Sequence, residues 1–216
     1  MPAAAGADVG SPLALAIGGT VLAVIASFVV GALSPAAWLA AALGKDVRRS
    51  GSGNPGATNA GRVLGWKWGV LVGVLDVAKG WVPTWIVLHL YGSTLAMAAG
   101  VAAVLGHVFS PFLQGRGGKG VATTLGALLG VAPWLALVAA VVFAVLVLIL
   151  RRVGYASVGS AIALVVAGAL TLGGVLPLAA RPSIGAAGVL LGLLVLVRHR
   201  SNLVAAWRRR RAFPTE

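Results

Sequence analysis

The sequence predicts an all-α integral membrane protein that crosses the bilayer several times. Its 216 residues are 59% hydrophobic and only 10% charged, with a mean hydropathy of +1.00, whereas ordinary soluble domains carry about 25% charged residues. Apolar stretches long enough to cross ~30 Å of hydrocarbon recur along the whole chain. These stretches are continuous rather than alternating, which indicates helices and not the strands of a barrel. Because no long polar segment remains, we expect one membrane domain over residues 1–216.

Glycines, prolines and charged residues divide the chain into apolar segments. Residues 121–150 would form a helix of about 45 Å at 1.5 Å per residue, too long for one crossing, and Pro133 is the natural break. The part before this break would be only about 18 Å long, so we expect it to be tilted or re-entrant. The expected membrane segments are seven in number: 13–43, 66–91, 94–113, 121–132, 134–150, 155–178 and 183–198.

The basic residues set the expected orientation. With seven crossings and the N-terminus outside, nearly all lysines and arginines fall in inner loops, and Arg181 alone falls outside. With six crossings, Arg151 and Arg152 would move to the outer side. We therefore expect an outside N-terminus and a cytoplasmic C-terminus. No basic residue precedes Lys45, so the first segment is expected to stay in place rather than act as a cleaved signal.

The first inner loop carries a run of small polar residues with a basic residue on each side. Ser50 to Arg62 reads SGSGNPGATNAGR. Glycines let backbone N–H groups approach a ligand, and successive N–H groups form an anion-binding nest. A flexible interhelical loop is the alternative, since Gly, Ser, Asn and Pro also form turns. We favour anion binding, because a plain loop rarely needs so many specific small polar residues.

A second glycine-rich stretch, Gly106 to Thr123, reads GHVFSPFLQGRGGKGVAT and leads into an expected helix. Backbone amides at a helix N-terminus, together with Lys119, suit a phosphate group. The stretch is not a Walker P-loop, and a glycine turn beside a snorkelling lysine is the alternative. His107 would be a base, a phosphate donor or a capped core histidine, and taken alone it favours the last.

Two further groups of polar residues interrupt the apolar pattern. RHRSN follows the last segment, where membrane anchoring explains the arginines without any site. His199 and Asn202 would share a face if the helix continued through them. Asp76 and Lys79 lie inside the second segment, where charges are usually paired or functional. A structural ion pair is the favoured interpretation of these two, and support of a ligand is the alternative.

The composition excludes several kinds of chemistry. The absence of cysteine excludes disulfides, thiolate ligands and a cysteine acyl-enzyme. With only four acidic residues, neither a metal site nor paired-carboxylate catalysis is expected. The net charge of +13 fits anionic lipid headgroups. Because the basic residues lie in short juxtamembrane loops rather than on a soluble surface, nucleic-acid binding is not expected.

These stretches, in this order and spacing, resemble the bacterial PlsY family, the acyl-phosphate:glycerol-3-phosphate acyltransferases. The resemblance covers about residues 31–202 and rests on GSGNPGATN followed by Arg62, on LDVAKG, on GHVFSPFLQGRGGKGVAT and on HRSN. It implies a seven-span enzyme of the bacterial inner membrane with its active site at the cytoplasmic face. Such an enzyme would move a fatty acyl group from acyl phosphate to the 1-hydroxyl of glycerol 3-phosphate. The products would be lysophosphatidic acid and phosphate, and no cofactor is implied.

The resemblance also implies roles for individual residues. The expected catalytic residues are Ser52, Arg62, Lys119 and His199. The expected substrate-binding residues, most of them small and polar, are Gly51, Gly53, Asn54, Gly56, Thr58, Asn59, His107, Gly117, Gly118, Gly120, Ser157 and Asn202. The chain departs from the family at Ser201, where Glu is frequent, and at Pro55, where Ile or Val is usual.

Acyl phosphate is an activated donor, so we expect the protein to supply mainly positioning and charge stabilisation. The glycerol hydroxyl would attack directly, with His199 or a substrate phosphate oxygen taking its proton. Ser52 would orient a substrate, and its action as a covalent nucleophile is the alternative. The competing function is a transporter of phosphorylated solutes or lipids. The candidate residues gather on one side and no inverted repeat is visible, and both points favour the enzyme.

Overall fold

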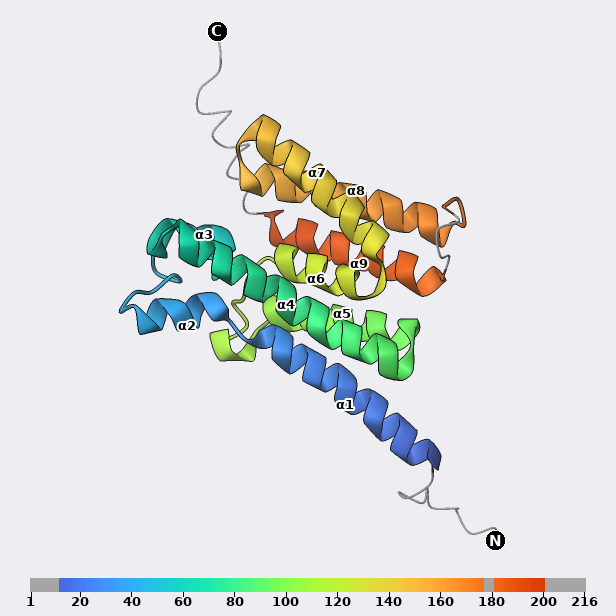
Figure 1. The fold of residues 1–216 in the computed structure, drawn as a ribbon. Coiled ribbons are helices and arrows are strands. Elements are labelled where there is room, and N and C mark those ends of the chain that lie inside the picture. Colours follow the sequence, from blue (N-terminus) through green and yellow to red (C-terminus); the bar gives the residue numbers. More distant parts are fainter. Residues whose placement is uncertain (1–11, 177–180, 201–216) are drawn as a thin grey trace.

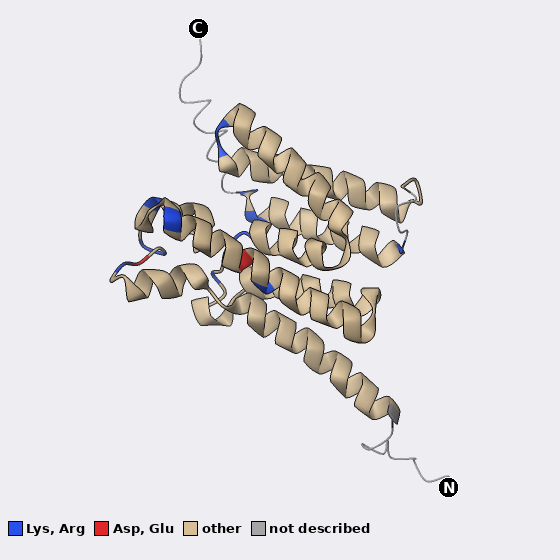
Figure 2. Ribbon diagram, in the orientation of Figure 1, with Lys and Arg blue, Asp and Glu red and all other residues tan. Residues whose placement is uncertain are grey.

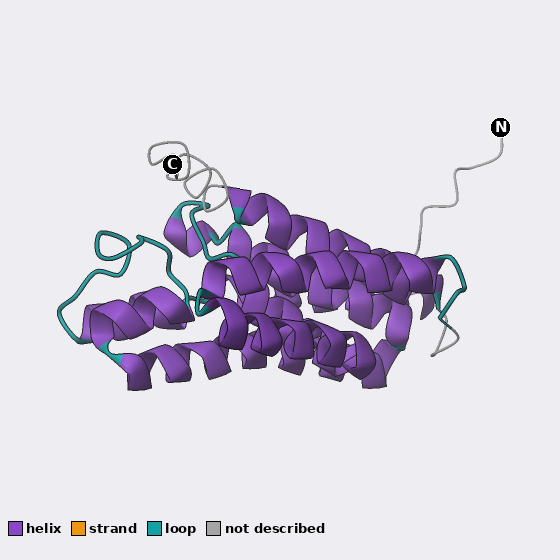
Figure 3. Cartoon of the chain, turned by 90° about the horizontal axis from the view of Figure 1, so that it is seen from above, coloured by secondary structure: helices purple, strands orange, loops and turns teal. Residues whose placement is uncertain are grey.

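The structure, a computed structural model, describes residues 12–176 and 181–200 of the chain. Within these ranges the chain is mostly helical, with loops between the helices and no strand (Figure 3). A single turn of 3-10 helix, Pro111–Leu113, also occurs. The α-helices, in chain order, are α1 (Pro12–Ala32), α2 (Pro35–Ala42), α3 (Ala57–Leu64), α4 (Trp66–Tyr91), α5 (Ser93–Val108), α6 (Val121–Val131), α7 (Pro133–Leu150), α8 (Val153–Leu172) and α9 (Pro182–Arg198).

Five of the described helical segments are long and apolar enough to cross a membrane. They correspond to α1, α4, α5 with the short helical turn after it, α7 and α8. Helices α6 and α9 are also apolar but have only 11 and 17 residues. Eleven residues rise about 16 Å, roughly half the thickness of the hydrocarbon core. The prediction of an all-helical protein with several membrane segments is therefore confirmed.

The expected single segment over residues 13–43 needs correction, because α1 ends at Ala32 and a separate helix, α2, begins at Pro35. Ser34 between them has an extended backbone, and its hydroxyl accepts a hydrogen bond from the Ala37 N–H. This is an N-cap, and a proline at the first helical position follows it. The apolar stretch is thus a membrane helix followed by a short helix that starts in a new direction (Figure 1).

The expected break near Pro133 is confirmed. Helix α6 ends at Val131, Ala132 has a non-helical backbone, and α7 starts at Pro133. The ring of Pro133 cannot continue the preceding helix, but it suits the first position of the next one. The expected segment 94–113 is also shorter as an α-helix, since α5 ends at Val108 and Pro111 starts the 3-10 turn.

Helices α4 and α6 touch through their backbones at two glycines. A Cβ atom on Gly80 of α4 would lie 2.2 Å from the carbonyl oxygen of Thr123, and one on Gly126 of α6 would lie 2.0 Å from that of Val77. Small residues permit this close approach of membrane helices. The contact holds the first turn of α6 against the middle of α4, near Asp76.

Helices α5, α6, α7, α8 and α9 share a core of buried side chains. Its largest fully buried members are Leu128, Leu135 and Leu191. Helix α1 lies along the edge of this bundle beside α5 (Figure 1). A Cβ atom on Gly106 of α5 would lie 2.0 Å from the carbonyl oxygen of Phe28, so these two helices also pack backbone against backbone. The remaining surface of α1 carries exposed apolar side chains, as expected for a helix facing lipid.

Most of the described basic residues gather at one end of the bundle, whereas Lys79 lies within α4 (Figure 2). This end holds the loop between α2 and α3, the loop before α6, the α7–α8 connection and the end of α9. Arg181 lies at the opposite end, at the start of α9. The grouping of basic residues expected from the sequence is therefore present in the fold.

Candidate functional site

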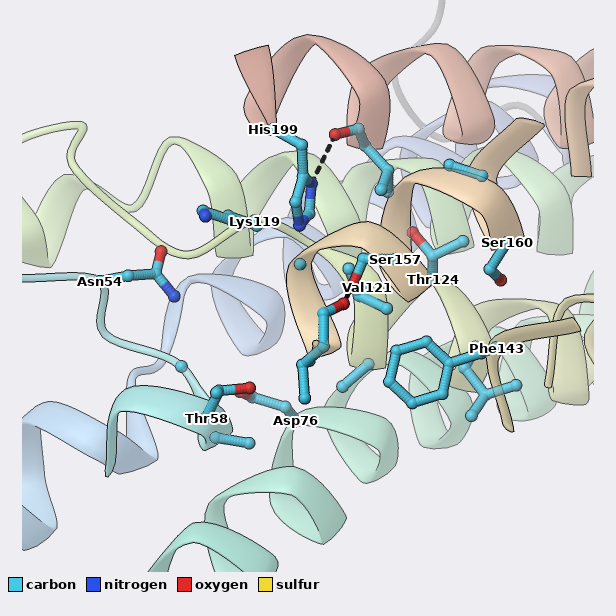
Figure 4. Close-up of a pocket in the computed structure, with 18 of the residues that line it drawn as sticks. Asn54, Thr58, Asp76, Lys119, Val121, Thr124, Phe143, Ser157, Ser160 and His199 are labelled. Atoms are coloured by element: carbon cyan, nitrogen blue, oxygen red, sulfur yellow. Dashed lines mark hydrogen bonds between the residues drawn. The ribbon is translucent and has the colours of Figure 1, made fainter. Parts of the chain in front are cut away.

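A cavity of about 360 Å³ lies where the loops of the basic end meet the helices. One part of its lining is polar and comes from three regions distant in sequence: Ser52, Asn54, Thr58, Arg62, Lys119 and His199. Another part is apolar and comes from helices α6 to α9: Val121, Leu125, Ala140, Phe143, Leu164 and Val195. Figure 4 shows Asn54, Thr58, Lys119 and His199 on one side of the cavity and Phe143 on the other. Such a lining suits a ligand with an anionic head and an apolar tail.

The side chain of Asn59 organises the loop that carries Ser52. Its amide nitrogen donates to the carbonyl oxygens of Val47 and Ser50, at 2.8 and 3.0 Å. Its side-chain oxygen accepts from the backbone N–H of Ser52 at 2.7 Å. Asn59 is only 1% exposed, although it contributes to the cavity lining. Because these bonds engage both ends of the amide, we interpret Asn59 as the support of Ser52 rather than as a direct ligand.

Two glycines of the same loop have a backbone role. Gly51 and Gly53 have φ values of +63° and +69°, in the left-handed region where a side chain is strained. A Cβ atom on Gly51 would also lie 2.3 Å from the side-chain oxygen of Asn59. Neither glycine lines the cavity, so they serve the path of the loop, whereas Gly56 at the N-cap of α3 does line it.

The glycine loop (residues 117–120) directly precedes α6 and packs against the end of α5. The amide of Gly117 donates to the carbonyl oxygen of Val108, and that of Gly118 donates to the carbonyl oxygen of His107, both at 3.1 Å. These two amides are therefore engaged by the end of α5, whereas binding of a phosphate group by the amides at the N-terminus of α6 stays a prediction. Their effect is to fix the main chain immediately before Lys119.

Arg198, at the last position of α9, binds the same loop through hydrogen bonds. Its guanidinium group donates to the carbonyl oxygens of Gly117 and Gly118, at 3.2 and 3.4 Å. The sequence explained this arginine as a membrane anchor, and the contact with the loop was not foreseen. A basic residue at the end of a final membrane helix looks the same in sequence whether it meets lipid or protein.

Positive charge is concentrated around Lys119, which is half-buried and lines the cavity. Burial lowers the pKa of Lys119, and the nearby charges of Arg198 and Arg62 lower it further. Each of these causes disfavours the cationic form. A bound phosphate group would reverse the effect, so the site is electrostatically complementary to an anion.

His199 follows α9 directly and is buried beside Lys119. Its Nδ1 lies 2.8 Å from the carbonyl oxygen of Val195 (Figure 4). A carbonyl only accepts hydrogen bonds, so Nδ1 carries the proton and Nε2 of the neutral ring is left as an acceptor. Burial lowers the pKa of His199, and the charges of Lys119 and Arg198 add to this, against the opposing effect of the Val195 bond. The ring is therefore neutral at pH 7 and able to accept a proton.

The favoured interpretation of Asp76 and Lys79 as an ion pair is confirmed, with Lys79 Nζ 2.9 Å from Asp76 Oδ1. His107 Nδ1 lies 3.6 Å from the same oxygen, so the histidine belongs to this buried cluster. Asp76 and His107 also contribute to the lining of the cavity. The cluster therefore adjoins the site, which the sequence alone left undecided.

All four expected catalytic residues line this one cavity, as do six of the expected substrate-binding residues: Asn54, Gly56, Thr58, Asn59, His107 and Ser157. Five expected glycines do not line it: Gly51, Gly53, Gly117, Gly118 and Gly120. Asn202 lies outside the described residues, as does Ser201. The apolar part of the cavity was not predicted, because Phe143 or Leu164 in a membrane helix reads the same whether it faces lipid or an internal cavity.

The fold and this cavity define a helical integral membrane protein with a binding site for an amphipathic anion. The chain belongs to the family described as Glycerol-3-phosphate acyltransferase, whose sequence profile matches residues 21–209.

Individual relatives agree with this membership. The chain is 44% identical over 185 residues to Glycerol-3-phosphate acyltransferase 1 of Deinococcus radiodurans, covering 84% of this chain and 89% of that protein. It is 38% identical over 173 residues to Glycerol-3-phosphate acyltransferase of Staphylococcus aureus, covering 76% and 82% of the two chains. The fold is similar to a crystal structure of PlsY, an integral membrane glycerol 3-phosphate acyltransferase, in its glycerol 3-phosphate form. That comparison has a TM-score of 0.81 and 34% identity, and covers 89% of this chain and 94% of the other. The lysophosphatidic acid form of PlsY gives a TM-score of 0.78.

Proposed function

We propose that this chain transfers a fatty acyl group from acyl phosphate to the 1-hydroxyl of glycerol 3-phosphate, giving lysophosphatidic acid and phosphate. Membership of the acyltransferase family supports this reaction. The observation that carries the proposal is the single cavity in which Ser52, Arg62, Lys119 and His199 meet an apolar lining from α6 to α9. A donor with a fatty tail and a phosphate head requires both kinds of surface in one place.

The proposed reaction is a direct transfer. The oxygen of the glycerol 1-hydroxyl attacks the acyl carbonyl carbon, the new ester bond forms, and the bond between that carbon and the phosphate oxygen breaks. The leaving group departs as phosphate with the bonding electron pair. Lys119 and Arg62 stabilise the negative charge that develops on the phosphate oxygens, and they do so in a partly buried site where such charges act strongly.

The proton of the attacking hydroxyl goes to Nε2 of His199 or to an oxygen of a substrate phosphate. A neutral ring whose Nε2 is an acceptor supports the first route. Ser52, held by Asn59 through its backbone N–H, orients a phosphate or the hydroxyl. The alternative is an acyl-enzyme on Ser52, and incubation with labelled acyl phosphate alone tests it. Label that remains covalently bound after denaturation would replace the direct mechanism with this one.

We further propose that the protein lies in the bacterial inner membrane as one domain with seven crossings. Helices α6 and α9 would complete the five longer spans, with the N-terminus outside and the C-terminus in the cytoplasm. The gathering of basic residues at one end supports this orientation (Figure 2). The cavity would then open to the cytoplasm, where glycerol 3-phosphate is dissolved, while acyl phosphate would arrive from the bilayer.

The competing proposal, a transporter of phosphorylated solutes or lipids, receives less support. Transport sites usually lie near the bilayer midplane, between repeated halves of the protein. The basic residues of the lining here, Arg62 and Lys119, come from the basic end of the bundle. The family to which the chain belongs is also one of acyltransferases.

The deciding experiment supplies purified protein in detergent with acyl phosphate and glycerol 3-phosphate, and measures lysophosphatidic acid. We expect product from the wild type and a loss of at least about 100-fold in Lys119→Ala, the usual effect of removing a charge-stabilising donor. Lys67→Ala is the matched control, since Lys67 is an exposed cation that does not line the cavity. Absence of product from wild type, with uptake of glycerol 3-phosphate into proteoliposomes, would favour the transporter instead.

A further inference from the structure

Three ionisable side chains form a cluster inside the bundle that the proposed reaction does not use. Asp76, Lys79 and His107 are 2%, 8% and 7% exposed. Charged groups inside membrane helices are costly and are usually functional. An ion pair alone accounts for Asp76 and Lys79, but it does not account for the histidine beside them. The contacts of that histidine point to a role in the site.

Asp76 holds one edge of the His107 ring. Its Oδ1 lies 2.9 Å from Lys79 Nζ and 3.6 Å from His107 Nδ1. Lys79 is itself fixed, because its ammonium group also donates to the carbonyl oxygen of Leu33 at 2.6 Å. The carboxylate therefore has little freedom to move. The Nδ1 edge of the imidazole turns toward this fixed charge, which sets the orientation of the ring.

The opposite edge of the ring lies directly against the glycine loop. A Cβ atom on Gly118 would lie 2.1 Å from Nε2 of His107 and 2.6 Å from its Cε1. The backbone of the same histidine accepts the hydrogen bond from the Gly118 amide. The loop main chain thus rests on His107 by both its ring and its carbonyl, one residue before Lys119.

We propose that Asp76 acts through His107 to position the glycine loop, and hence Lys119, for the transfer reaction. Asp76 and His107 are then positioning residues and not catalytic ones, and this role rests on the proposed function. The competing role for His107 is direct contact with a substrate, since it contributes to the cavity lining. The two roles differ in whether the effect of changing His107 on activity depends on the presence of Lys119.

A double-mutant cycle between His107 and Lys119 tests this dependence. We expect His107→Asn to lower kcat/KM on the order of 100-fold, the effect of a displacement near 1 Å at a reacting centre. In a Lys119→Gln background the same change should cost less than about threefold, because the group that it misplaces is gone. Losses that multiply in the double variant would overturn the proposal, since independent residues behave in that way.

A matched pair of variants tests the part played by Asp76. Asp76→Asn with Lys79→Met and Asp76→Leu with Lys79→Met both remove the two charges and have similar shapes. Only the first keeps an oxygen facing His107 Nδ1. We expect the first to exceed the second by about tenfold in kcat/KM, because only its oxygen can keep a polar contact with His107 Nδ1. This difference should vanish when His107→Asn is added. Equal activities in the pair would overturn the role of Asp76.

Ser110→Ala controls for a general loss of stability. The Ser110 hydroxyl is buried at the end of α5 and donates to the carbonyl oxygen of Ala32 at 2.6 Å. It does not line the cavity. We expect Ser110→Ala to lower the thermal midpoint. In a variant that combines Ser110→Ala with Lys119→Gln, the two fold-losses in kcat/KM should multiply. If the two double variants at Asp76 and Lys79 do not fold, the double-mutant cycle between His107 and Lys119 tests the proposal by itself. Wild-type protein that makes no lysophosphatidic acid would refute the proposed function, whereas an active wild type with multiplying losses refutes only this inference.

Discussion

Replacing Gly117 with alanine should disable the site by lifting the glycine loop. The new Cβ atom would lie 1.9 Å from the carbonyl oxygen of His107 and 2.8 Å from that of Val108. Ordinary contact begins near 3.4 Å, so 3.4 minus 1.9 leaves 1.5 Å that the loop has to move. Both obstacles are backbone atoms of α5, and neither can rotate away. The two hydrogen bonds from Gly117 and Gly118 to these same carbonyls would be stretched or lost.

The expected effect on the reaction follows from this displacement. A shift of about 1 Å at a reacting group costs on the order of 100-fold in rate, so we expect kcat/KM of Gly117→Ala to fall at least that far. Loss of two hydrogen bonds should lower the free energy of unfolding by about 1–3 kcal/mol. The assay is synthesis of lysophosphatidic acid, with the thermal midpoint measured alongside.

Gly115→Ala is the matched control for this prediction. Gly115 has a φ of +74° but open space around its Cβ position, so alanine there strains the backbone by about 1–2 kcal/mol without a clash. We expect Gly115→Ala to be less stable than wild type. Its activity should stay within about threefold of wild type, a much smaller loss than a 1 Å displacement causes. Equal activities of Gly117→Ala and Gly115→Ala would refute the reasoning from the contact with α5.

Three further predictions concern other parts of the chain. Asn59→Ala removes the three hydrogen bonds that shape the loop around Ser52, so the free energy of unfolding should fall by about 2–4 kcal/mol and activity should be lost; a denaturation midpoint like that of wild type would contradict this support role. The folded-state pKa of His199 lies below its ordinary value of 6.5, so the stability that it contributes is present above pH 6.5 and is lost as the pH falls through the lowered pKa. The thermal midpoint without substrate should therefore fall on acidification, and His199→Gln should reduce that fall; an identical pH profile for the variant would show that another group is responsible. Gly106→Leu should separate α1 from α5 and cost about 1–3 kcal/mol or more by overpacking, whereas Gly18→Leu, whose Cβ position on α1 has nothing within 4 Å, should cost little. Equal thermal midpoints for these two variants would argue against the backbone contact.

Much of the fold was accessible from sequence because the bilayer imposes simple rules. Length and apolarity identify the long helices, and Pro133 ends a helix by its covalent structure, so both were predictable. The break at Ser34 was missed because hydropathy does not distinguish a continuous apolar helix from two helices joined by a cap. The short hydroxyl side chain and the following proline are the signal that was available for it.

The candidate site was predictable to a different degree. Residues with charge or unusual polarity, such as Lys119 and His199, stand out in an apolar chain. The bonding of the Gly117 and Gly118 amides to α5 depends on how a loop packs onto a distant helix end, and local sequence carries no trace of it. Local sequence also does not reveal the hydrogen bonds from Arg198 to the loop, because they join residues about 80 positions apart in the chain.

The backbone contact between α4 and α6 sets how deeply the glycine loop is recessed. Gly80, which meets Thr123, is 14 residues beyond the start of α4 at Trp66, or about 21 Å along that helix. Lys119, four residues before Thr123, therefore lies between this contact and the end of the bundle that carries most of the positive charge. A lipid donor can present its headgroup there while its chain stays among apolar side chains and lipid. Drawing ten methylene groups into water instead would cost about 8 kcal/mol. In the proposed reaction, the short helix α6 would place the site where the water-soluble substrate and the lipid donor can meet.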